Sequence, residues 1–557
     1  MQYLHPHIKR NEITPLIVFS FFIALSVVLS NHIQITGNPY SGLATQNYIT
    51  PYGLSDIGVL VAAFTMVLLC CLALCHITCK AITAKSAGNN KPLAVKPIAA
   101  CTAIMFALHL PYLLTYYPGF VFSDSLSSIG QALGQLPCSN HFPVAYTALI
   151  GACIALAHTL GLSTTTGCTL YSLMQTFVMC ITYSLMIQWI MQRTRIARWW
   201  RAILVAVFGL APYIATYSIA LWKDPLFSAA IVVVTVLLFD FVSTSGKITH
   251  SSKAWIPMFA TCCIIIAFLR SNGLLIDAGV FAALLLCSAK RTTSLRRAPA
   301  NAIAAIPLAA IALNLLVTGP IYSAAGIAPA EKAEGYGIPL NQMARVVALG
   351  GDISEADAAY MNELLPFSEY ASVYTPTCTD LLKWNPQFNN AALDNDFLVH
   401  WISMGIDNPV VYFESWELQT FGYWTIDHPL VLLHNGNING GVPQMLNSQA
   451  EANAYGITIK NYLGDTAERI FSRANPSIPL GWVAWGITFL AITFFLQGRR
   501  RYIIVFVPCL MLVASLLIAS PIWYWERYGA ALQFLAPFFL ALPLALPANP
   551  SANTSKE

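Results

Sequence analysis

Long apolar segments alternate with short polar loops along most of the chain, and this pattern predicts helices that cross a membrane. A helix needs about 20 apolar residues to span a bilayer, and it satisfies its own backbone hydrogen bonds in lipid. Twelve segments meet this description. They lie at 13–30, 57–79, 98–116, 167–191, 202–220, 225–242, 255–269, 274–289, 298–318, 478–497, 503–520 and 529–547. The first has no clean cleavage site after it, so we expect an uncleaved anchor.

The composition agrees with a mainly α-helical, polytopic membrane protein of about 12 transmembrane helices. Of the 557 residues, 57% are hydrophobic and 10% are charged, whereas a soluble chain carries about 25% charged residues. These values exclude a disordered, a collagen-like or a nucleic-acid-coating chain. The net charge of +4 is too small to indicate a polyanionic partner, so the positions of the charges are more informative than their sum.

The charges are segregated along the chain. Residues 319–477 hold 17 acidic and six basic residues. Most of the other basic residues lie in short loops between the apolar segments, and such loops stay in the cytoplasm. We therefore expect a cell-membrane protein with both termini cytoplasmic, in which residues 319–477 form a mixed, mostly helical extracytoplasmic domain.

Residues 142–160 are also apolar enough to span a membrane. If they crossed, the arginine cluster at 193–201 and every later loop would change sides, against the positive-inside rule. We therefore expect this segment to lie parallel to the membrane at its outer interface, or to re-enter. The alternative is a thirteenth span with an inverted topology.

Asp124 lies in the first outer loop of interest, shortly after the segment 98–116. A short amphipathic stretch follows it, and then Asn140 and His141. A carboxylate at a lipid–water boundary is partly desolvated, which favours a stronger base than in water. Asp124 is thus a candidate catalytic or metal-binding residue. The alternative is that it only caps the helix that follows it.

Two further outer turns carry charged residues. Lys223 and Asp224 lie between two spans, in the motif LWKDPLFS; the alternative is a lysine that reaches for solvent and a helix-capping aspartate. Arg270 and Asn272 lie between the next two spans. Arg270 could instead form a structural ion pair with Asp277, which lies one turn into the following span.

Glu526 and Arg527 lie among aromatic residues before the last span. An aromatic belt with a local ion pair is the alternative to a functional role. Outside residues 319–477, the outward-facing bases are Lys223, Arg270 and Arg527. Sparse cations near several carboxylates suit an enzyme that handles a lipid-linked phosphate, because phosphate is bound by Arg and Lys.

At these residues the chain resembles the GT-C superfamily of multi-pass glycosyltransferases, and more closely a poorly characterised bacterial membrane family within it. The resemblance covers residues 97–545. Its motifs are YPGFVFSDS, HFPVAYT, LWKDPLF, RSNG, EGYGIPLNQMARVV and ERY, in this order. It implies a core at 97–318 with a catalytic outer loop at 117–166. Residues 1–96 would add two spans, and 478–557 would form the C-terminal spans.

The resemblance also implies an activity. Asp124 would be the catalytic residue, and the donor would be a polyprenyl-phosphate sugar used on the outer face. The acceptor hydroxyl would belong to a cell-envelope glycan, lipid or protein, and one displacement would invert the anomeric centre. Lys223, Arg270 and Arg527 would bind the donor phosphate. The expected supporting residues are His141, Asp224, Asn272 and Glu526.

A divalent cation, held by Asp124 and His141, is one option for activating the acceptor. Phe142 separates His141 from Pro143, which departs from the His-Pro element of the family. No other cofactor is expected, because the chain has no dinucleotide fingerprint, no P-loop and no HExxH motif.

The 14 cysteines show no CxxC pair or zinc spacing. Cys138 and Cys378 lie in the watery outer regions, where they could form a disulfide or remain free thiols. Trp384, Trp416 and Trp424 could stack on sugars or pack in the core of the outer domain.

Three other functions remain open from the sequence. A transporter or flippase would show internal repeats and charged residues near the membrane midplane. A non-catalytic sensor or assembly protein would tolerate changes at Asp124. A hydrolase would release the sugar to water with the same residues.

Overall fold

The computed structural model describes residues 13–35, 47–83, 90–289, 297–394, 396–426, 449–473, 478–519 and 526–546. Over these ranges the protein is mainly helical, and its strands form one small antiparallel hairpin. Eight helices are long and apolar enough to cross a membrane, or nine if one bent pair counts as a single span. The predicted class, a helical membrane protein, agrees with this architecture.

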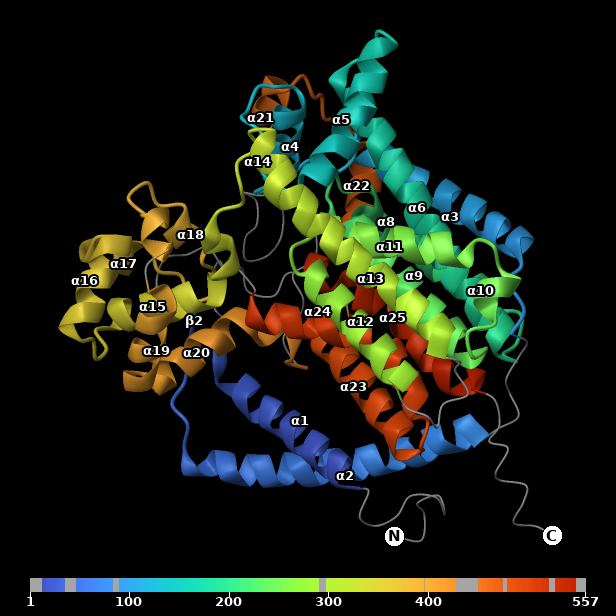
Figure 1. Ribbon diagram of the computed structural model, residues 1–557, viewed down its shortest axis with the longest axis horizontal. Coiled ribbons are helices and arrows are strands. Elements are labelled where there is room, and N and C mark those ends of the chain that lie inside the picture. Colours follow the sequence, from blue (N-terminus) through green and yellow to red (C-terminus); the bar gives the residue numbers. More distant parts are fainter. Residues whose placement is uncertain are drawn as a thin grey trace.

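Each of the twelve predicted segments contains a helix (Figure 1). These helices are α1 (Thr14–His32), α2 (Leu54–Thr83), α3 (Val95–Thr115), α6 (Thr164–Arg193), α7 (Trp200–Leu210) with α8 (Pro212–Ile219), α9 (Asp224–Ser243), α11 (Trp255–Leu269), α12 (Gly273–Ala289), α13 (Arg297–Leu316), α23 (Leu480–Leu496), α24 (Val507–Ile518) and α25 (Glu526–Ala545). Because α11, α12 and α23 are short apolar helices, the number of twelve crossings stays a prediction.

Two of these helices differ from the simple predicted spans. The segment 202–220 is bent by 55° between α7 and α8, because Pro212 cannot continue the backbone ladder and holds Ala211 in an extended conformation. α13 continues through a π-helical turn, η2 (Val317–Ile321), into α14 (Tyr322–Ala324). The helix therefore extends past the predicted end at residue 318.

Helix α9 lies at the centre of the bundle. Apart from the acids near its two ends, its sequence is apolar on every side, and such a helix is stable only when neighbours cover it completely. It packs against α6, α11, α24 and α25. Both ends of α9 carry a buried acid, Asp224 at its first residue and Asp240 in its last turn.

A second hydrophobic core organises the helical domain drawn at the left of Figure 1, here called the α15–α20 domain. Its elements are η3 (Lys332–Gly335), α15 (Gly337–Leu349), α16 (Glu355–Leu364), α17 (Phe367–Val373), α18 (Asp380–Lys383), η4 (Asn390–Asp394), α19 (Phe397–Asp407) and α20 (Pro409–Thr420). The next element, η5 (Phe421–Tyr423), packs into the core of the bundle. As predicted, α16 follows Ser354, whose hydroxyl accepts a hydrogen bond from the Asp357 backbone amide.

Short elements join the bundle to this domain. Strands β1 (Ile33–Ile35) and β2 (Asn47–Ile49) pair between α1 and α2. The Tyr52 hydroxyl then donates to the buried Glu417 carboxylate of α20, at 3.1 and 3.2 Å. Burial, together with nearby Glu414, raises the pKa of Glu417 to about 7. The remaining helices are α4 (Ser123–Ala132), α5 (Val144–Thr159), α10 (Ile248–Ser251), α21 (Gln449–Ala454) and α22 (Gly464–Arg473).

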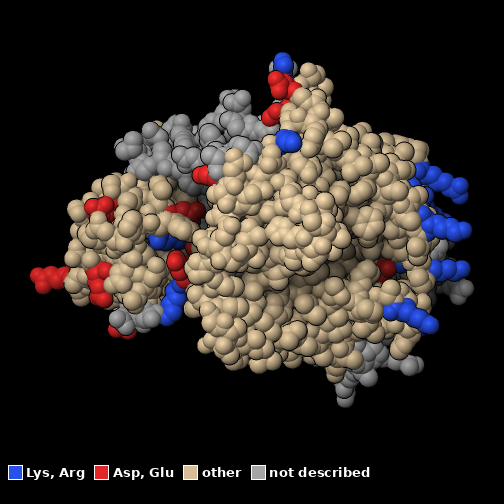
Figure 2. Space-filling model, turned by 90° about the horizontal axis from the view of Figure 1, so that it is seen from above, with Lys and Arg blue, Asp and Glu red and all other residues tan. Residues whose placement is uncertain are grey.

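Exposed Lys and Arg side chains gather at one end of the bundle, opposite the α15–α20 domain (Figure 2). We call it the basic end. The exposed basic residues here include Lys80 in the last turn of α2 and, in the segments that follow α2, α6 and α9, Lys91, Arg198, Lys247 and Lys253. The opposite end is called the site end below, because the predicted site residues lie there.

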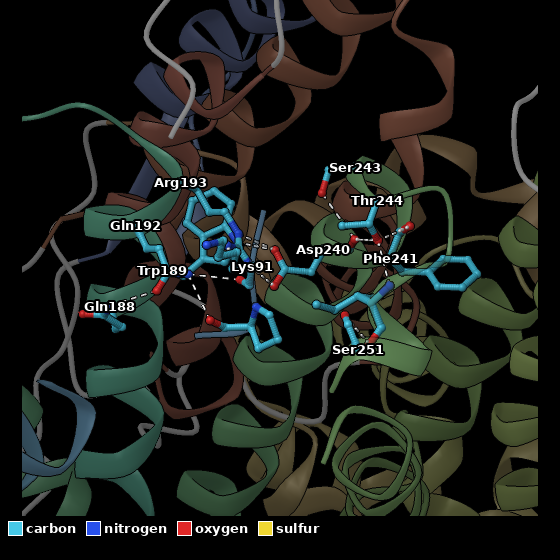
Figure 3. Close-up of polar contacts among 12 residues, drawn as sticks. Lys91, Gln188, Trp189, Gln192, Arg193, Asp240, Phe241, Ser243, Thr244 and Ser251 are labelled. Carbon is cyan, nitrogen blue, oxygen red and sulfur yellow. Dashed lines mark hydrogen bonds and ion pairs between the residues drawn. The ribbon is translucent and has the colours of Figure 1, made fainter. Parts of the chain in front are cut away.

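Near the basic end, a buried ion pair joins α6 to α9 (Figure 3). The Arg193 guanidinium donates to both oxygens of Asp240, with Nε 2.9 Å from Oδ1 and Nη2 2.6 Å from Oδ2. The Trp189 indole donates to Oδ1 at 3.1 Å, and Arg193 Nη1 donates to the Lys91 carbonyl at 2.7 Å. Both charges are therefore matched by hydrogen bonds inside the protein.

Candidate functional site

Asp124 occupies the first turn of α4, and it does not cap that helix. The N-cap position is taken by Phe122, whose backbone amide donates to Ser125 Oγ at 3.2 Å. Ser125 Oγ in turn donates to the Leu221 carbonyl at 2.6 Å, and the Tyr146 hydroxyl donates to the same carbonyl. These bonds fix α4 against the loop before α9, so that the Asp124 carboxylate faces Lys223.

The Asp124 carboxylate is shared by two cations from distant parts of the chain. Its Oδ2 accepts a hydrogen bond from Arg527 Nη1 at 3.0 Å and lies 3.9 Å from Lys223 Nζ. The side chain of Asp124 is 23% exposed, whereas those of Lys223 and Arg527 are 14% and 7% exposed. The carboxylate is therefore the more accessible partner. Lys223 is not a solvent-reaching surface lysine, since its ammonium faces Asp124.

A second ion pair lies beside the first. Arg270, the residue after α11, donates through Nη1 to Asp224 Oδ1. Asp224 is 1% exposed, and its Oδ2 has no hydrogen-bond partner among the described residues. The alternative pairing of Arg270 with Asp277 is therefore wrong. Asp277 is buried in α12, and neither of its oxygens has a hydrogen-bond partner in the described part of the chain.

Aromatic rings hold these cations in place. The Arg527 guanidinium lies 4.5 Å from the ring centre of Trp222, and the Arg270 guanidinium lies 4.2 Å from that of Tyr528. Trp222 stacks on Phe122 at 4.0 Å. Cation–π contacts of this kind favour a desolvated cation. We did not predict roles for Trp222 and Tyr528, although each directly adjoins a predicted cation in the sequence.

The protonation of Asp124 differs from the sequence-based expectation. Burial raises the pKa of its carboxyl, but the positive charges of Arg527 and Lys223 lower it by more, so the pKa lies below its usual value. The expected stronger base is therefore wrong for this arrangement. Burial also lowers the pKa of the Lys223 ammonium, and the negative charges of Asp124 and Asp224 offset only part of that effect.

His141 lies on the side of the site that faces the α15–α20 domain. Its Nδ1 is 3.8 Å from Glu334 Oε1, and it groups with Glu331 and Glu334 in an arrangement that could hold a metal ion. Asp124 is not a member of that group. Lys383 Nζ lies 2.8 Å from the same Glu334 oxygen, so an ammonium already supplies positive charge there. The predicted cation site of Asp124 with His141 gains no support from this geometry.

Asn272 and Glu526 differ in what the structure describes. Asn272 Nδ2 donates to Ser515 Oγ of α24 at 3.0 Å, and its Oδ1 accepts from Arg270 Nε at 3.4 Å. Asn272 therefore orients Arg270. Glu526 begins α25, but its side chain lies outside the described residues.

The cysteines and tryptophans that were assigned possible roles differ in their exposure and contacts. Cys138 is an exposed free thiol and Cys378 a buried one, so the disulfide between them is not formed. Trp424 is 8% exposed and belongs to the core. Trp416 stacks on it at 5.8 Å, whereas Trp384 is 59% exposed. The Trp384 side chain is therefore accessible to a ligand.

Taken together, five elements bring three cations and two carboxylates to the site end of the bundle: α4, the loop before α9, α9, the end of α11 and α25. Among the described side chains, one positive charge is in excess: Asp124 and Asp224 face Lys223, Arg270 and Arg527. A phosphodiester carries one negative charge, and Arg and Lys are its usual ligands. The site is therefore chemically suited to a monoanionic phosphate beside an accessible carboxylate.

The fold and the site thus define a mainly helical protein with membrane-spanning character and a charged cluster at one end. A family model matches residues 137–556, about three quarters of the chain, and the chain belongs to that family, DUF6020, a family of unknown function. Comparison with curated proteins and with solved structures finds no match. Of the predicted site residues, Asp124 lies before the matched region and all the others lie within it.

Proposed function

We propose that the protein is a membrane glycosyltransferase of the GT-C type. It would move a sugar from a polyprenyl-phosphate donor to an acceptor hydroxyl on the outer face of the membrane. The observation that carries the proposal is the position of Asp124, an accessible carboxylate in direct contact with Arg527 and Lys223. Ionisable groups that gather with shifted pKa values are typical of functional sites, and the pKa values of Asp124 and Lys223 are both shifted.

The proposed topology places the basic end in the cytoplasm. This follows the positive-inside rule, and it puts the α15–α20 domain and the site end outside. Twelve helices would cross. Helix α5 has 16 residues and is about 24 Å long, shorter than the hydrocarbon core of about 30 Å. Since α11, with 15 residues, is shorter still, length alone does not decide; α5 would lie on the outer side beside the first half of α6 without crossing, because a crossing there would move the basic loops that follow to the other side of the membrane.

The charge of the cluster selects the donor class. One excess positive charge matches the single negative charge of a lipid phosphate monosugar, a phosphodiester, better than the higher charge of a diphosphate. The lipid tail would lie between helices, and the phosphate would contact Lys223, Arg527 and Arg270. Each cation would stabilise the charge that grows on the departing phosphate by about 3–4 kcal/mol, by analogy with single oxyanion donors.

The lowered pKa of Asp124 suggests how donor binding prepares the site. In the free protein, Arg527 and Lys223 hold the carboxylate ionised but weakly basic. A bound phosphate would attract the same two cations, which weakens their hold on Asp124 and raises its pKa. Asp124 would then accept the proton of an acceptor hydroxyl. The hydroxyl oxygen would attack the anomeric carbon opposite the phosphate, so the configuration inverts.

A transporter or flippase is the second candidate. It would place its binding groups near the membrane midplane. In the described residues the accessible charges lie at the two ends of the bundle, and Asp240 is already matched by Arg193. The site end therefore supports group transfer better than passage through the bundle.

The decisive experiment is lipid-carrier and glycan profiling of cells that lack the protein. We expect one sugar-charged polyprenyl phosphate to accumulate and one glycan to lose that sugar. Wild type should reverse both changes, and Asp124→Asn should reverse neither while inserting at the wild-type level. The control is Asp352→Asn, which removes a carboxylate from the α15–α20 domain and should behave as wild type.

Two results would exclude the proposal. An Asp124→Asn variant that restores the glycan would remove Asp124 from the chemistry. A carrier pool that is unchanged in the deletion, with an altered distribution of the carrier between the two leaflets, would favour the flippase.

A further inference from the structure

An exposed tryptophan lies a short distance from the candidate catalytic carboxylate. Trp384 follows α18 in the α15–α20 domain and is 59% exposed. Its ring meets that of His141 edge to face, with the ring centres 5.4 Å apart and an interplanar angle of 82°. In this arrangement the neighbouring His141 covers only a small part of the indole, so a flat, partly apolar ligand can stack on it.

A continuous series of contacts leads from Trp384 to Asp124. The rings of His141 and Phe142 lie 4.5 Å apart, and Lys223 Nζ lies 5.1 Å from the centre of the Phe142 ring. Lys223 then contacts Asp124 at 3.9 Å. His141 is also near enough to Asp124 to influence its pKa. A ligand on Trp384 would therefore lie on the His141 side of the proposed reaction centre.

Polar groups surround this aromatic surface. Lys383 Nζ lies 2.8 Å from Glu334 Oε1 and 2.9 Å from Asp380 Oδ1. The side chains of Glu334 and Asp380 are 27% and 25% exposed, so their remaining oxygens are accessible. Carbohydrate recognition combines an aromatic face for the C–H side of the ring with carboxylates that accept hydrogen bonds from hydroxyl groups.

The charge here is opposite to that of the donor cluster. Glu331, Glu334 and Asp380 outnumber Lys332 and Lys383, so this side of the site is negative, whereas the group around Arg527 has one excess positive charge. A negative surface repels an anionic acceptor and admits a neutral one. The two ligands of a transferase, an anionic donor and a neutral acceptor, would thus be separated by charge.

We infer that Trp384, His141, Glu334 and Asp380 form the acceptor subsite, and that it binds a neutral sugar unit whose hydroxyl faces Asp124. This inference rests on the proposed function and deepens it. The transferred sugar would therefore be added to a glycan, and not to a protein side chain or to an anionic lipid headgroup.

Binding and transfer are tested separately, with the full-length protein in nanodiscs. A glycan array that carries neutral and anionic oligosaccharides measures binding. We expect wild type to bind a neutral glycan, Trp384→Ala to lose about tenfold in affinity, and Trp384→Phe to keep most of it. The matched control is Trp482→Ala, which removes another exposed tryptophan, 56% exposed, from α23.

Several outcomes would overturn the acceptor subsite. Wild type could bind no neutral glycan, or prefer anionic glycans, or Trp384→Ala could bind as wild type does. Quenching of the Trp384 fluorescence by brominated lipids, seen as a difference between wild type and Trp384→Phe, would make it a membrane anchor instead.

A transfer assay with the carrier that accumulates in deletion cells distinguishes this inference from the proposed function. We expect Trp384→Ala to raise KM for the acceptor about tenfold, with kcat little changed, and Asp124→Asn to bind the array glycan but transfer nothing. If transfer occurs and Trp384→Ala leaves KM unchanged, the subsite is refuted and the transferase stands. If glycan binding depends on Trp384 but no transfer occurs, the transferase is refuted and the glycan site stands.

Discussion

Each end of α9 carries a buried aspartate, and the two carboxylates differ in how completely neighbouring groups match their charge and hydrogen bonds. Asp240 accepts three hydrogen bonds, two from Arg193 and one from Trp189, and its own charge is matched by a single cation. Asp224 pairs with Arg270 through one oxygen, while Oδ2 has no hydrogen-bond partner in the described residues. Two more cations and Asp124 lie beside this second pair.

The difference separates a structural ion pair from a binding site. A matched and fully hydrogen-bonded pair has nothing to gain from a ligand, and its removal leaves an uncompensated charge in the protein interior. A cluster with one excess cation and an accessible carboxylate still favours an anion. Function is therefore expected where the electrostatic matching is incomplete, and stability where it is complete.

The largest expected effect lies at the matched end. Arg193→Met leaves Asp240 buried without its cation, which should lower the free energy of unfolding by about 3–5 kcal/mol. Unfolding in mixed micelles of increasing denaturing detergent measures the loss. The folded fraction should keep its transfer activity, because Arg193 and the donor cluster lie at opposite ends of α9.

The double variant Arg193→Met/Asp240→Leu is the control for that measurement. It removes both charges, so it should recover most of the lost stability. A single variant as stable as wild type would mean that water or another cation already compensates Asp240, and the contrast between the two ends would then disappear.

The opposite pattern is expected at the site end. Arg527→Met should lower kcat about 10²–10³-fold, because one charge that stabilises the departing phosphate is lost. Its stability should fall by less than that of Arg193→Met, since Lys223 still neutralises Asp124. Transfer from the accumulated carrier gives kcat. Arg469→Met, on the exposed face of α22, is the matched control, and equal activity of the two variants would contradict a phosphate-binding role.

Much of the fold could be predicted because the alternation of long apolar segments with short polar loops determines where the helices lie. A run such as that of α11 is apolar over its whole length, and its predicted limits, 255–269, agree with Trp255–Leu269. The bend at Pro212 was missed, since composition alone does not show whether a proline lies inside a helix or between two. The hairpin of β1 and β2 is too short to leave a recognisable alternation.

The charged residues of the site could be predicted, but the ion pairs that they form could not. Lys223, Arg270 and Arg527 stand out because few cations are expected at that end of the bundle. The partner of Arg270 could not be derived, because Asp277 lies near it in the sequence, whereas its actual partner Asp224 lies 46 positions away and only tertiary packing brings it close. Arg193 was grouped with the loop charges, although it is 1% exposed and paired with Asp240.

The protonation of Asp124 was wrong for the same reason. Desolvation can be inferred from the place of Asp124 at a membrane boundary. Its contacts with Arg527 and Lys223 cannot be inferred, because Arg527 lies hundreds of positions away in the chain and Lys223 about one hundred. Opposite charges in contact lower a carboxyl pKa, and here they outweigh burial.

A smaller effect is expected on the pH dependence of transfer. Burial lowers the pKa of Lys223 from the ordinary 10.5, so the lysine loses its charge, and activity falls, at a lower pH than an exposed lysine would require. Lys223→Arg should extend activity to higher pH, because arginine stays protonated. The pH profile of kcat/KM measures this. Lys247→Arg, exposed at the basic end, should leave the profile unchanged, and an unshifted alkaline limb in Lys223→Arg would remove Lys223 from the site.

Asp124 gives the corresponding effect on stability. Its pKa is lower in the folded than in the unfolded protein, so the ionised carboxylate stabilises the fold fully above the ordinary aspartate value of 3.8. That stabilisation is lost as the pH falls from this value through the lowered folded pKa. The unfolding temperature of wild type should therefore drop more steeply below pH 3.8 than that of Asp124→Asn; parallel curves would mean that the pKa is not lowered.

The smallest effect tests whether the loop before α9 is held for stability or for function. The buried Tyr146 hydroxyl donates to the Leu221 carbonyl, which also accepts from Ser125. Tyr146→Phe should therefore lower the free energy of unfolding by only about 0.5–1.5 kcal/mol, the ordinary net value of one hydrogen bond. Tyr370→Phe, in the α15–α20 domain, removes an equivalent buried bond to the Met361 carbonyl at 2.9 Å and should cost about the same.

Only Tyr146→Phe should also slow transfer several-fold, because a looser Leu221 shifts Lys223 relative to Asp124. If both variants lower stability and neither slows transfer, the position of Lys223 is set by its ion pair with Asp124 and not by the backbone of the loop. The hydrogen bonds of the loop before α9 would then serve stability alone, as the ion pair of Arg193 with Asp240 does at the other end of α9.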